Sequence, residues 1–140
     1  MKTRRVTMLQ HTLVRELDLA VLVVRLSAWA RENGAGEVEA AAVTTCGLEL
    51  ATNVLKYAHS GRLRALVVQQ QRSYGLKLIV EDVGPGIADL AQATVEGFST
   101  GGSLGLGLSG VQRLMDEVQF SNITGIGTRI CAIKWLSEGP

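Results

Sequence analysis

The chain has 140 residues, 46% of them hydrophobic, and a formal net charge of +1 from 14 basic and 13 acidic residues. This length fits one domain, residues 1–140, whose core is large enough to fold without disulfides or structural metal. Nucleic-acid-binding proteins usually carry a larger basic excess and more aromatic residues than the 4% found here, so that class is disfavoured.

The first third of the chain predicts an edge strand followed by two helices. Residues 4–14 have the pattern of a weak strand. Apolar residues at helical spacing over residues 19–30 predict a helix with Asp18 as its N-cap and Gly34 as its end. A second helix is predicted over residues 37–58.

The remainder of the chain predicts strands joined by turns, with one short helix. The apolar spacing changes to every second residue, which is the period of a half-buried strand. A helix is expected at residues 106–116, and turns are expected at 72–75 and 124–127. The expected strands are residues 63–67, 76–80, 117–122 and 127–135. This order favours an α+β sandwich in which helices cover one face of a mostly antiparallel sheet.

Three polar side chains of the second predicted helix project in one direction. At about 100° per residue, Glu49, Asn53 and Lys56 fall within a narrow arc. The opposite side carries an apolar set: Leu48, Ala51, Leu55 and Ala58. The arc fits a site built from a carboxylate, an amide and an amine, although a solvated helix face with a Glu–Lys pair is the commoner reason for such a pattern.

A carboxylate stands at the end of a predicted apolar strand. Asp82 is followed by the turn-forming residues 83–86. There it can accept a hydrogen bond from an amino group of a ligand, while Gly84 and Gly86 let that ligand approach the backbone. The hydroxyl of Thr128, at the start of the last strand, could join Asp82 in binding a base. An ordinary strand exit and a β-branched strand residue remain the alternatives.

Half of the glycines lie in one segment that carries almost no charge. Residues 84–110 contain eight of the 16 glycines, and their only charged residues are Asp89 and Glu96. Phosphate groups would therefore be held there by backbone N–H groups and a helix N-terminus. Residues 105–110 match GxGxxG, but no strand precedes them, and the GxxxxGK[ST], HRD and DFG motifs are missing. The segment thus favours nucleotide binding outside the commonest frameworks.

Neither the cysteines nor the histidines form a ligand set. Cys46 and Cys131 are far apart among apolar or small neighbours, which predicts two buried free thiols. His11 and His59 have no His, Cys, Asp or Glu at ligand spacing. Neither a metal nor catalysis is therefore assigned to them.

No segment predicts a membrane span or an export signal. The apolar run at residues 19–24 is too short to cross a bilayer. The N-terminus lacks the apolar core of a signal peptide. A cytoplasmic protein that binds neither membrane nor nucleic acid is expected.

Four motifs in register resemble the characteristic boxes of the GHKL ATPase superfamily, which includes gyrase B, Hsp90, histidine kinases and MutL proteins. The motifs are ELATN at 49–53, EDVGPGI at 81–87, GLGL at 105–108 and GT at 127–128. Within that superfamily, the chain is similar to the small switch serine/threonine kinases of the anti-sigma-factor kinase family over residues 14–135. The resemblance implies the Bergerat ATP-binding fold, a two-layer α+β sandwich with a mostly antiparallel mixed sheet and helices on one face.

The resemblance also implies roles for the polar residues. Glu49 would be the general base for the acceptor hydroxyl. Asn53 would ligate the Mg²⁺ that bridges the phosphates of ATP. Asp82 would accept a hydrogen bond from the adenine amino group, with Thr128 assisting.

In the glycine-rich segment, the resemblance implies the loops that hold ATP. Gly84 and Gly86 would admit the base, and residues 88–104 would be a mobile lid. The phosphates would be held by the amides of Gly105, Leu106, Gly107 and Leu108. Residues 78–112 contain no Lys or Arg, so Mg²⁺, these amides and Lys56 would carry the transition-state charge. Slow turnover is expected without a basic residue in the lid.

As a function, the resemblance implies an ATP- and Mg²⁺-dependent kinase of Ser or Thr residues in stress or sigma-factor signalling. Its substrate would be a STAS-domain scaffold or antagonist, after which the kinase would engage a phosphatase or another downstream protein. The alternative is a binding module that sequesters a partner such as a sigma factor, with nucleotide tuning its affinity. A histidine-kinase fragment is disfavoured because no helix pair with a phosphoacceptor histidine is apparent.

Overall fold

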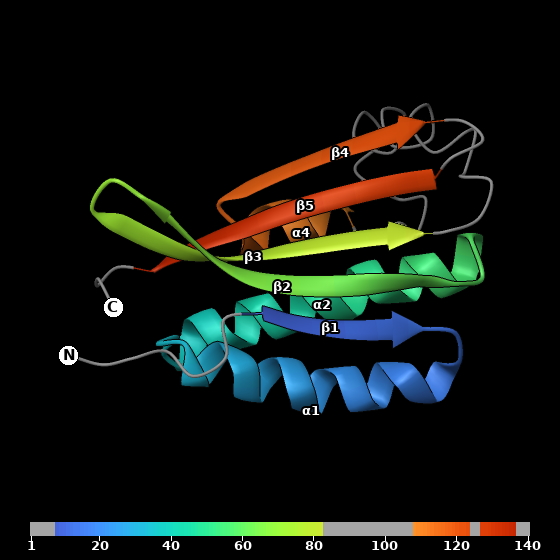
Figure 1. Cartoon of the computed structure of the whole chain (residues 1–140), viewed down its shortest axis with the longest axis horizontal. Coiled ribbons are helices and arrows are strands. Elements are labelled where there is room, and N and C mark those ends of the chain that lie inside the picture. The colour runs from blue at the N-terminus through green and yellow to red at the C-terminus, as the bar shows by residue number, and fades with distance from the viewer. Residues whose placement is uncertain (1–7, 83–107, 124–126, 137–140) are drawn as a thin grey trace.

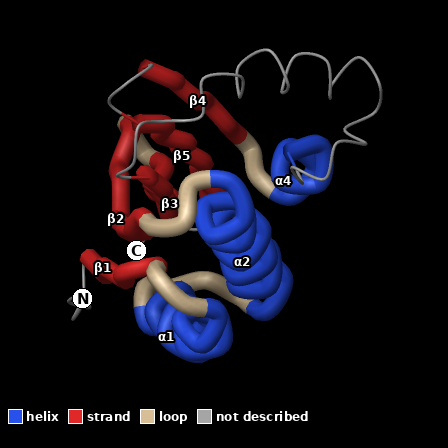
Figure 2. Tube along the Cα trace, turned by 90° about the vertical axis from the view of Figure 1, so that its right-hand side faces the viewer, coloured by secondary structure: helices blue, strands red, loops and turns tan. Residues whose placement is uncertain are grey.

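Five strands form one sheet, and the helices lie together on one of its faces (Figure 1 and Figure 2). This computed structural model describes residues 8–82, 108–123 and 127–136. The strands, in the spatial order β1-β2-β3-β5-β4, are β1 (Met8–Leu13), β2 (Gly61–Gln70), β3 (Ser73–Asp82), β4 (Glu117–Ile123) and β5 (Gly127–Leu136). The helices are α1 (Glu16–Glu32), α2 (Glu37–Tyr57) and α4 (Leu108–Leu114). The predicted two-layer α+β class is confirmed, and all pairings between described strands are antiparallel.

The long helices lie where the sequence predicts them, but α1 begins earlier. Its first residue is Glu16, so Asp18 lies inside the first turn rather than at the N-cap. From there, the Asp18 carboxylate accepts hydrogen bonds from the backbone N–H groups of Val14 (2.8 Å) and Arg15 (2.9 Å). Gly34 follows α1 with a φ of +100°, the conformation of a helix-ending glycine. Among the described helices, none has the length and apolar composition needed to cross a membrane.

The β2–β3 hairpin turns earlier than predicted. Only Gln71 and Arg72 separate the two strands, and Gln71 has a φ of +54°. The expected turn at 72–75 is therefore wrong, because Gly75 lies within β3. A Cβ at Gly75 would lie 2.8 Å from a ring carbon of Trp135. This glycine makes room for the neighbouring strand and does not form the turn.

The core lies between the sheet and the helices and follows the predicted alternation of the hairpin strands. The core-facing residues of these strands are at most 2% exposed: Leu63, Ala65, Leu76, Leu78 and Val80. The alternate residues of the same strands face away from the helices. No described helix covers that second face of the sheet (Figure 2).

The buried face of α2 differs from the predicted one. It is centred on Cys46, Leu50 and Val54, because α2 packs against both α1 and the sheet. Of the predicted apolar set, only Ala51 is fully buried. The other members are half-buried: Leu48, Leu55 and Ala58.

Both cysteines are free, as predicted, but only one is buried. Burial raises the pKa of the Cys46 thiol to about 12, and the nearby Glu49 carboxylate adds to this shift. Cys131 is half-buried, so its predicted burial is wrong. It occupies an alternate position of β5 between the buried Ile130 and Ala132, which places it on the sheet face without helices.

His11 of β1 forms hydrogen bonds with two residues of α1. Its Nδ1 lies 2.8 Å from a guanidinium nitrogen of Arg25, and its Nε2 lies 2.8 Å from the carbonyl oxygen of Asp18. A guanidinium can only donate, so Nδ1 is the acceptor and Nε2 carries the hydrogen that it donates to Asp18. The buried imidazole thus links β1 to α1.

Gly47 is the contact point of the two long helices and gives the first prediction. A Cβ at this position would collide with Cδ2 of Leu26 in α1. We expect Gly47→Ala to lower the free energy of unfolding in urea by about 1–3 kcal/mol through overpacking. Gly110→Ala in α4 is the matched control, because its Cβ would meet nothing within 4 Å. The control should gain up to about 1 kcal/mol from helix propensity. Equal effects of the two substitutions would contradict the packing argument.

Candidate functional site

Three strand ends meet at one edge of the sheet. β3 ends at Asp82, which is paired with Gly61 at the start of β2. β5 begins beside them with Gly127 and Thr128. Because β2 and β5 both run antiparallel to β3, their first residues lie at its end (Figure 1). The edge collects residues that are far apart in the sequence.

Asp82 and Thr128 are in direct contact at this edge. The backbone N–H of Thr128 donates a hydrogen bond of 3.0 Å to Oδ2 of Asp82. Both residues are only 7% exposed. The structure therefore brings together the carboxylate and the hydroxyl residue that the sequence singled out. It also fixes the orientation of the carboxylate from the neighbouring strand.

Two glycines allow this close approach. Gly127 has a φ of +146°, and a Cβ there would lie 2.7 Å from the carbonyl oxygen of Asp82 and 3.3 Å from Oδ1. At Gly61, a Cβ would collide with the carbonyl oxygen of Glu81 and would lie 2.8 Å from Cγ1 of Val54. Sequence reasoning missed Gly61, because a single glycine at a strand start carries no signal without the pairing register.

The contact of Val54 with Gly61 brings the second half of α2 to the strand ends. The adjacent residue, Asn53, is half-buried, whereas Glu49 and Lys56 are exposed. Because all three belong to α2, their spacing puts them on one side of this helix. The Lys56 ammonium lies 5.4 Å from the centroid of the Tyr57 ring, within cation–π range.

Most of the predicted phosphate loop lies outside the described residues. This applies to the expected lid at 88–104 and to Gly84, Gly86, Gly105, Leu106 and Gly107. Leu108 is the first residue of α4, and its side chain is 4% exposed and packs in the core. Only its backbone is therefore available to a ligand.

A cluster of charges joins the same strand ends on the opposite face of the sheet. Oε1 of Glu81 accepts hydrogen bonds of 3.1 Å from both Arg62 and Arg64. Oε2 forms an ion pair of 2.8 Å with Arg129. Arg62 and Arg129 lie directly opposite Glu81 on β2 and β5. Sequence reasoning missed this cluster, although the alternation of the hairpin strands already places Arg62 and Arg64 on one face.

The Glu81 carboxylate is stabilised in its ionised form. Its partial burial alone would raise the pKa. Hydrogen bonds from Arg129 and Arg62, together with the charge of Arg64, outweigh that effect and lower the pKa below its usual value. The cluster thus stabilises the fold at pH values above the ordinary pKa of a glutamate, and this contribution is lost as the pH falls through the lowered pKa.

Glu81→Gln therefore gives a pH-dependent prediction. At neutral pH it should lower the free energy of unfolding by about 1–3 kcal/mol, because three guanidinium groups lose their carboxylate. The difference from the wild type should shrink as the pH falls through the lowered pKa of Glu81. Urea unfolding across this range measures it, with Glu32→Gln, an exposed carboxylate at the end of α1, as control. A difference that stays constant with pH would disprove the electrostatic explanation.

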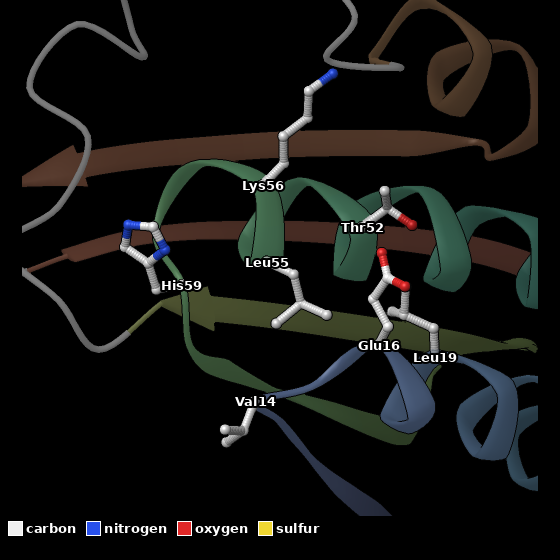
Figure 3. Close-up of a pocket in the computed structure, with 7 residues that line it drawn as sticks. All are labelled: Val14, Glu16, Leu19, Thr52, Leu55, Lys56 and His59. Atoms are coloured by element: carbon white, nitrogen blue, oxygen red, sulfur yellow. The ribbon is translucent and has the colours of Figure 1, made fainter.

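A groove lies beside this site, between the start of α1 and the end of α2 (Figure 3). Its volume is 510 Å³. It is lined by Val14, Glu16, Leu19, Thr52, Leu55, Lys56 and His59. Leu55 points toward Val14, whereas Lys56 extends from the other side of the helix (Figure 3). Lys56 therefore belongs both to the groove and to the polar arc with Glu49 and Asn53. The sequence did not predict this groove.

An α+β sandwich with a buried strand-end carboxylate beside a polar helix face defines a class of ATP-binding domains. Residues 14–134 match the model of the histidine kinase-like ATPase domain family, and the chain belongs to this family. The match covers nearly the same range as the resemblance predicted from the four motifs.

A curated relative specifies the class further. The chain is 49% identical over 107 residues to the serine/threonine-protein kinase RsbT of Bacillus subtilis (strain 168), covering 76% of this chain and 80% of the relative. At this similarity, the chain is an enzyme of the serine/threonine-protein kinase class that uses ATP.

A solved structure shows the same fold at low sequence identity. One chain of the crystal structure of the SiaB–SiaC complex from Pseudomonas aeruginosa superposes with a TM-score of 0.66 and 15% identity. The match covers 93% of this chain and 89% of that one. The architecture therefore extends to distant sequences.

Proposed function

We propose that this kinase binds Mg²⁺-ATP where α2 meets the ends of β3 and β5, and phosphorylates a Ser or Thr of a STAS-domain protein. The observation that carries the proposal is the buried Asp82 carboxylate, bonded to the backbone of Thr128 at the edge where Val54 of α2 lies close to Gly61. Similarity to a serine/threonine-protein kinase supports the chemistry. A STAS-domain antagonist or scaffold as substrate, and a phosphatase as later partner, follow from the family resemblance.

The strand ends are suited to a purine. Thr128 donates its backbone N–H to one carboxylate oxygen of Asp82, which restrains the orientation of the group. A carboxylate oxygen so oriented can accept a hydrogen bond from the exocyclic amino group of adenine. The missing side chain at Gly127 keeps the backbone beside Asp82 uncovered. Gly84 and Gly86 would border the base on the other side.

The second half of α2 is suited to the phosphates. Mg²⁺ binds oxygen ligands and usually takes one or two from protein and the rest from phosphates and water, so the single amide oxygen of Asn53 fits this role. The ion, when bound, would neutralise charge on the phosphates. Glu49 lies one turn before Asn53, and its exposed carboxylate can accept the proton of an acceptor hydroxyl. The amides of Gly105, Leu106, Gly107 and Leu108 would hold the phosphates from the α4 side.

Two substitutions distinguish the binding of ATP from the transfer of its phosphate. Glu49→Gln should leave the affinity for ATP within about twofold of the wild type, yet lower the rate of transfer by a factor on the order of 10²–10⁴, because the base is removed. Asp82→Asn should weaken ATP binding by roughly tenfold or more, because a charge-assisted hydrogen bond is lost. Calorimetry measures the first quantity, and labelled phosphate transfer to a purified STAS-domain protein measures the second.

The outcomes discriminate between the proposed functions. Normal transfer by Glu49→Gln would overturn the assignment of the base. ATP binding without transfer to any STAS-domain protein, with partner affinity changed by nucleotide, would favour the alternative of a binding module. Glu32→Gln, at the exposed end of α1, serves as the control for both measurements.

The groove is the proposed site for the segment of the partner that carries the acceptor hydroxyl. It shares Lys56 with the polar arc of α2, which also carries Glu49, although Glu49 itself does not line the groove. Its walls combine apolar groups, such as Leu19 and Leu55, with the carboxylate of Glu16. An extended segment with an apolar residue and a neighbouring basic residue matches this lining.

The groove gives a prediction about the KM for the partner. Glu16→Lys should raise this KM by roughly tenfold, the effect of losing one well-placed contact, and leave the affinity for ATP unchanged. Glu32→Lys carries the same charge change at the opposite end of α1 and should leave the KM as it is. An equal effect of both substitutions on KM would point to long-range charge and exclude the groove as the docking site.

A further inference from the structure

The face of the sheet that no described helix covers, here called the open face, carries apolar side chains at its centre (Figure 2). The strand register places these residues on it: Met8, Leu66, Val68, Ile79, Cys131, Ile133 and Trp135. Met8 is 49% exposed, and all the others except the buried Ile79 are half-buried. The ring of Trp135 lies over Gly75, where a Cβ would be 2.8 Å from one of its carbons. Antiparallel sheets usually carry polar residues on a face turned to water, so this face is suited to being covered.

Positive charge predominates on the open face, mainly at the end of β3. The three arginines around Glu81 lie there, and Lys77 lies on the same face one turn of the pleat beyond Ile79. Among the described residues of this face, the only carboxylates are Glu81 and Glu117. Glu81 is bonded to the arginines, and Oε2 of Glu117 accepts a hydrogen bond of 2.8 Å from the Trp135 indole. A guanidinium has five N–H donors and a carboxylate accepts about four hydrogen bonds, so the arginines keep donors for further carboxylates.

The dimensions of the open face match a short helix. The distance along β3 from Gly75 to Glu81 is about 20 Å, which about 14 residues of helix span. Layered folds cover the face of a sheet with helices or with a second sheet, whereas an extended segment binds at a sheet edge. We propose that the open face binds an amphipathic helix of another protein. The apolar side of this helix lies along β3 and β5, and acidic residues at one of its ends contact the three arginines.

A second copy of this chain fits the open face less well. Its own open face would bring a second excess of positive charge. Both described carboxylates of that face are already bonded, Glu81 to the arginines and Glu117 to Trp135. A purely apolar occupant would displace water from the arginines without replacing it by a counter-charge, which costs free energy. An acidic amphipathic helix supplies both the apolar contact and the counter-charge.

A helix bound to the open face leaves the other side of the sheet accessible. The groove lies between α1 and α2, on the side that the helices cover, and Asp82 faces the same side. A partner on the open face can therefore bind without displacing ATP or a substrate segment from the sites proposed above. The inference depends on the open face alone and not on the proposed function.

The native Cys131 reports whether the open face is covered. Cys46 is buried and its pKa is about 12, so iodoacetamide modifies Cys131 of the folded wild type. The probe is a synthetic stapled helix of about 14 residues, with leucines at helical spacing on one side and glutamates in its first turn. It should slow this modification by roughly tenfold at low salt and less at about 1 M salt, because only the uncovered fraction reacts. An unchanged rate at about 1 mM peptide overturns the inference. A rate that falls with protein concentration alone also overturns it, because the occupant is then a second copy.

A double-mutant cycle tests the contact between the arginines and the acidic end of the helix. The Arg129 side chain is 56% exposed, so Arg129→Gln is expected to fold. It should weaken binding of the glutamate peptide by roughly three- to tenfold. It should not weaken binding of a peptide with glutamine in place of glutamate any further, because the shared interaction is already lost. Arg31→Gln, at an exposed arginine of α1, is the matched control and should bind like the wild type. Additive effects in the cycle, or an equal loss with Arg31→Gln, overturn the inference.

Discussion

The arrangement depends on the hydrogen bond from the backbone of Thr128 to the Asp82 carboxylate, because it ties β5 to the end of β3. Gly127 allows the close approach of β5 to Asp82, and Gly61 allows the close approach of β2 to Glu81 on the other side of β3. A side chain at either position would push against a carbonyl of β3. The same constraint places α2, since Val54 rests on Gly61 and carries Asn53 beside it. The contact between Val54 and Gly61 thus connects the part of the proposed site for the purine with the part for the phosphates.

Glu81 and Asp82 are neighbouring carboxylates with different surroundings because successive residues of a strand face opposite sides of the sheet. Three arginines neutralise Glu81 on the face without helices. Asp82 faces the helix side, where its Oδ2 accepts a hydrogen bond from the backbone N–H of Thr128. The first carboxylate therefore links three strands, and the second lies at the edge on the side of α2. The ion pairs thus join the strand ends on one face, and the proposed ATP site lies on the other.

Features that depend on the spacing of nearby residues could be predicted from the sequence. Features that depend on strand register or on the packing of helices could not. Helical spacing was enough to place Glu49, Asn53 and Lys56 on one side of α2, and a strand ending in Asp82 was enough to put a carboxylate at the sheet edge. The role of Gly61 and the Arg62–Glu81 pair require the alignment of β2 with β3, which no single segment contains. The Gly75 turn was wrong because glycine also occurs where a neighbouring strand comes close. The groove arises only when α1 packs on α2.

Lys56 belongs both to the groove proposed for the partner protein and to the side of α2 proposed for the phosphates of ATP. Residues 78–112 contain no Lys or Arg, so this segment supplies no cationic side chain for the phosphates of the proposed site. Lys56 lines the groove and belongs to the arc of Glu49 and Asn53, while its ammonium rests over Tyr57. Because a cation–π contact at an exposed site is worth only about 0.5–1 kcal/mol, a nearby phosphate can outcompete it. A partner chain in the groove would restrict the same side chain. In the proposed mechanism, occupation of the groove and charge at the phosphates would therefore be linked through the side chain of Lys56.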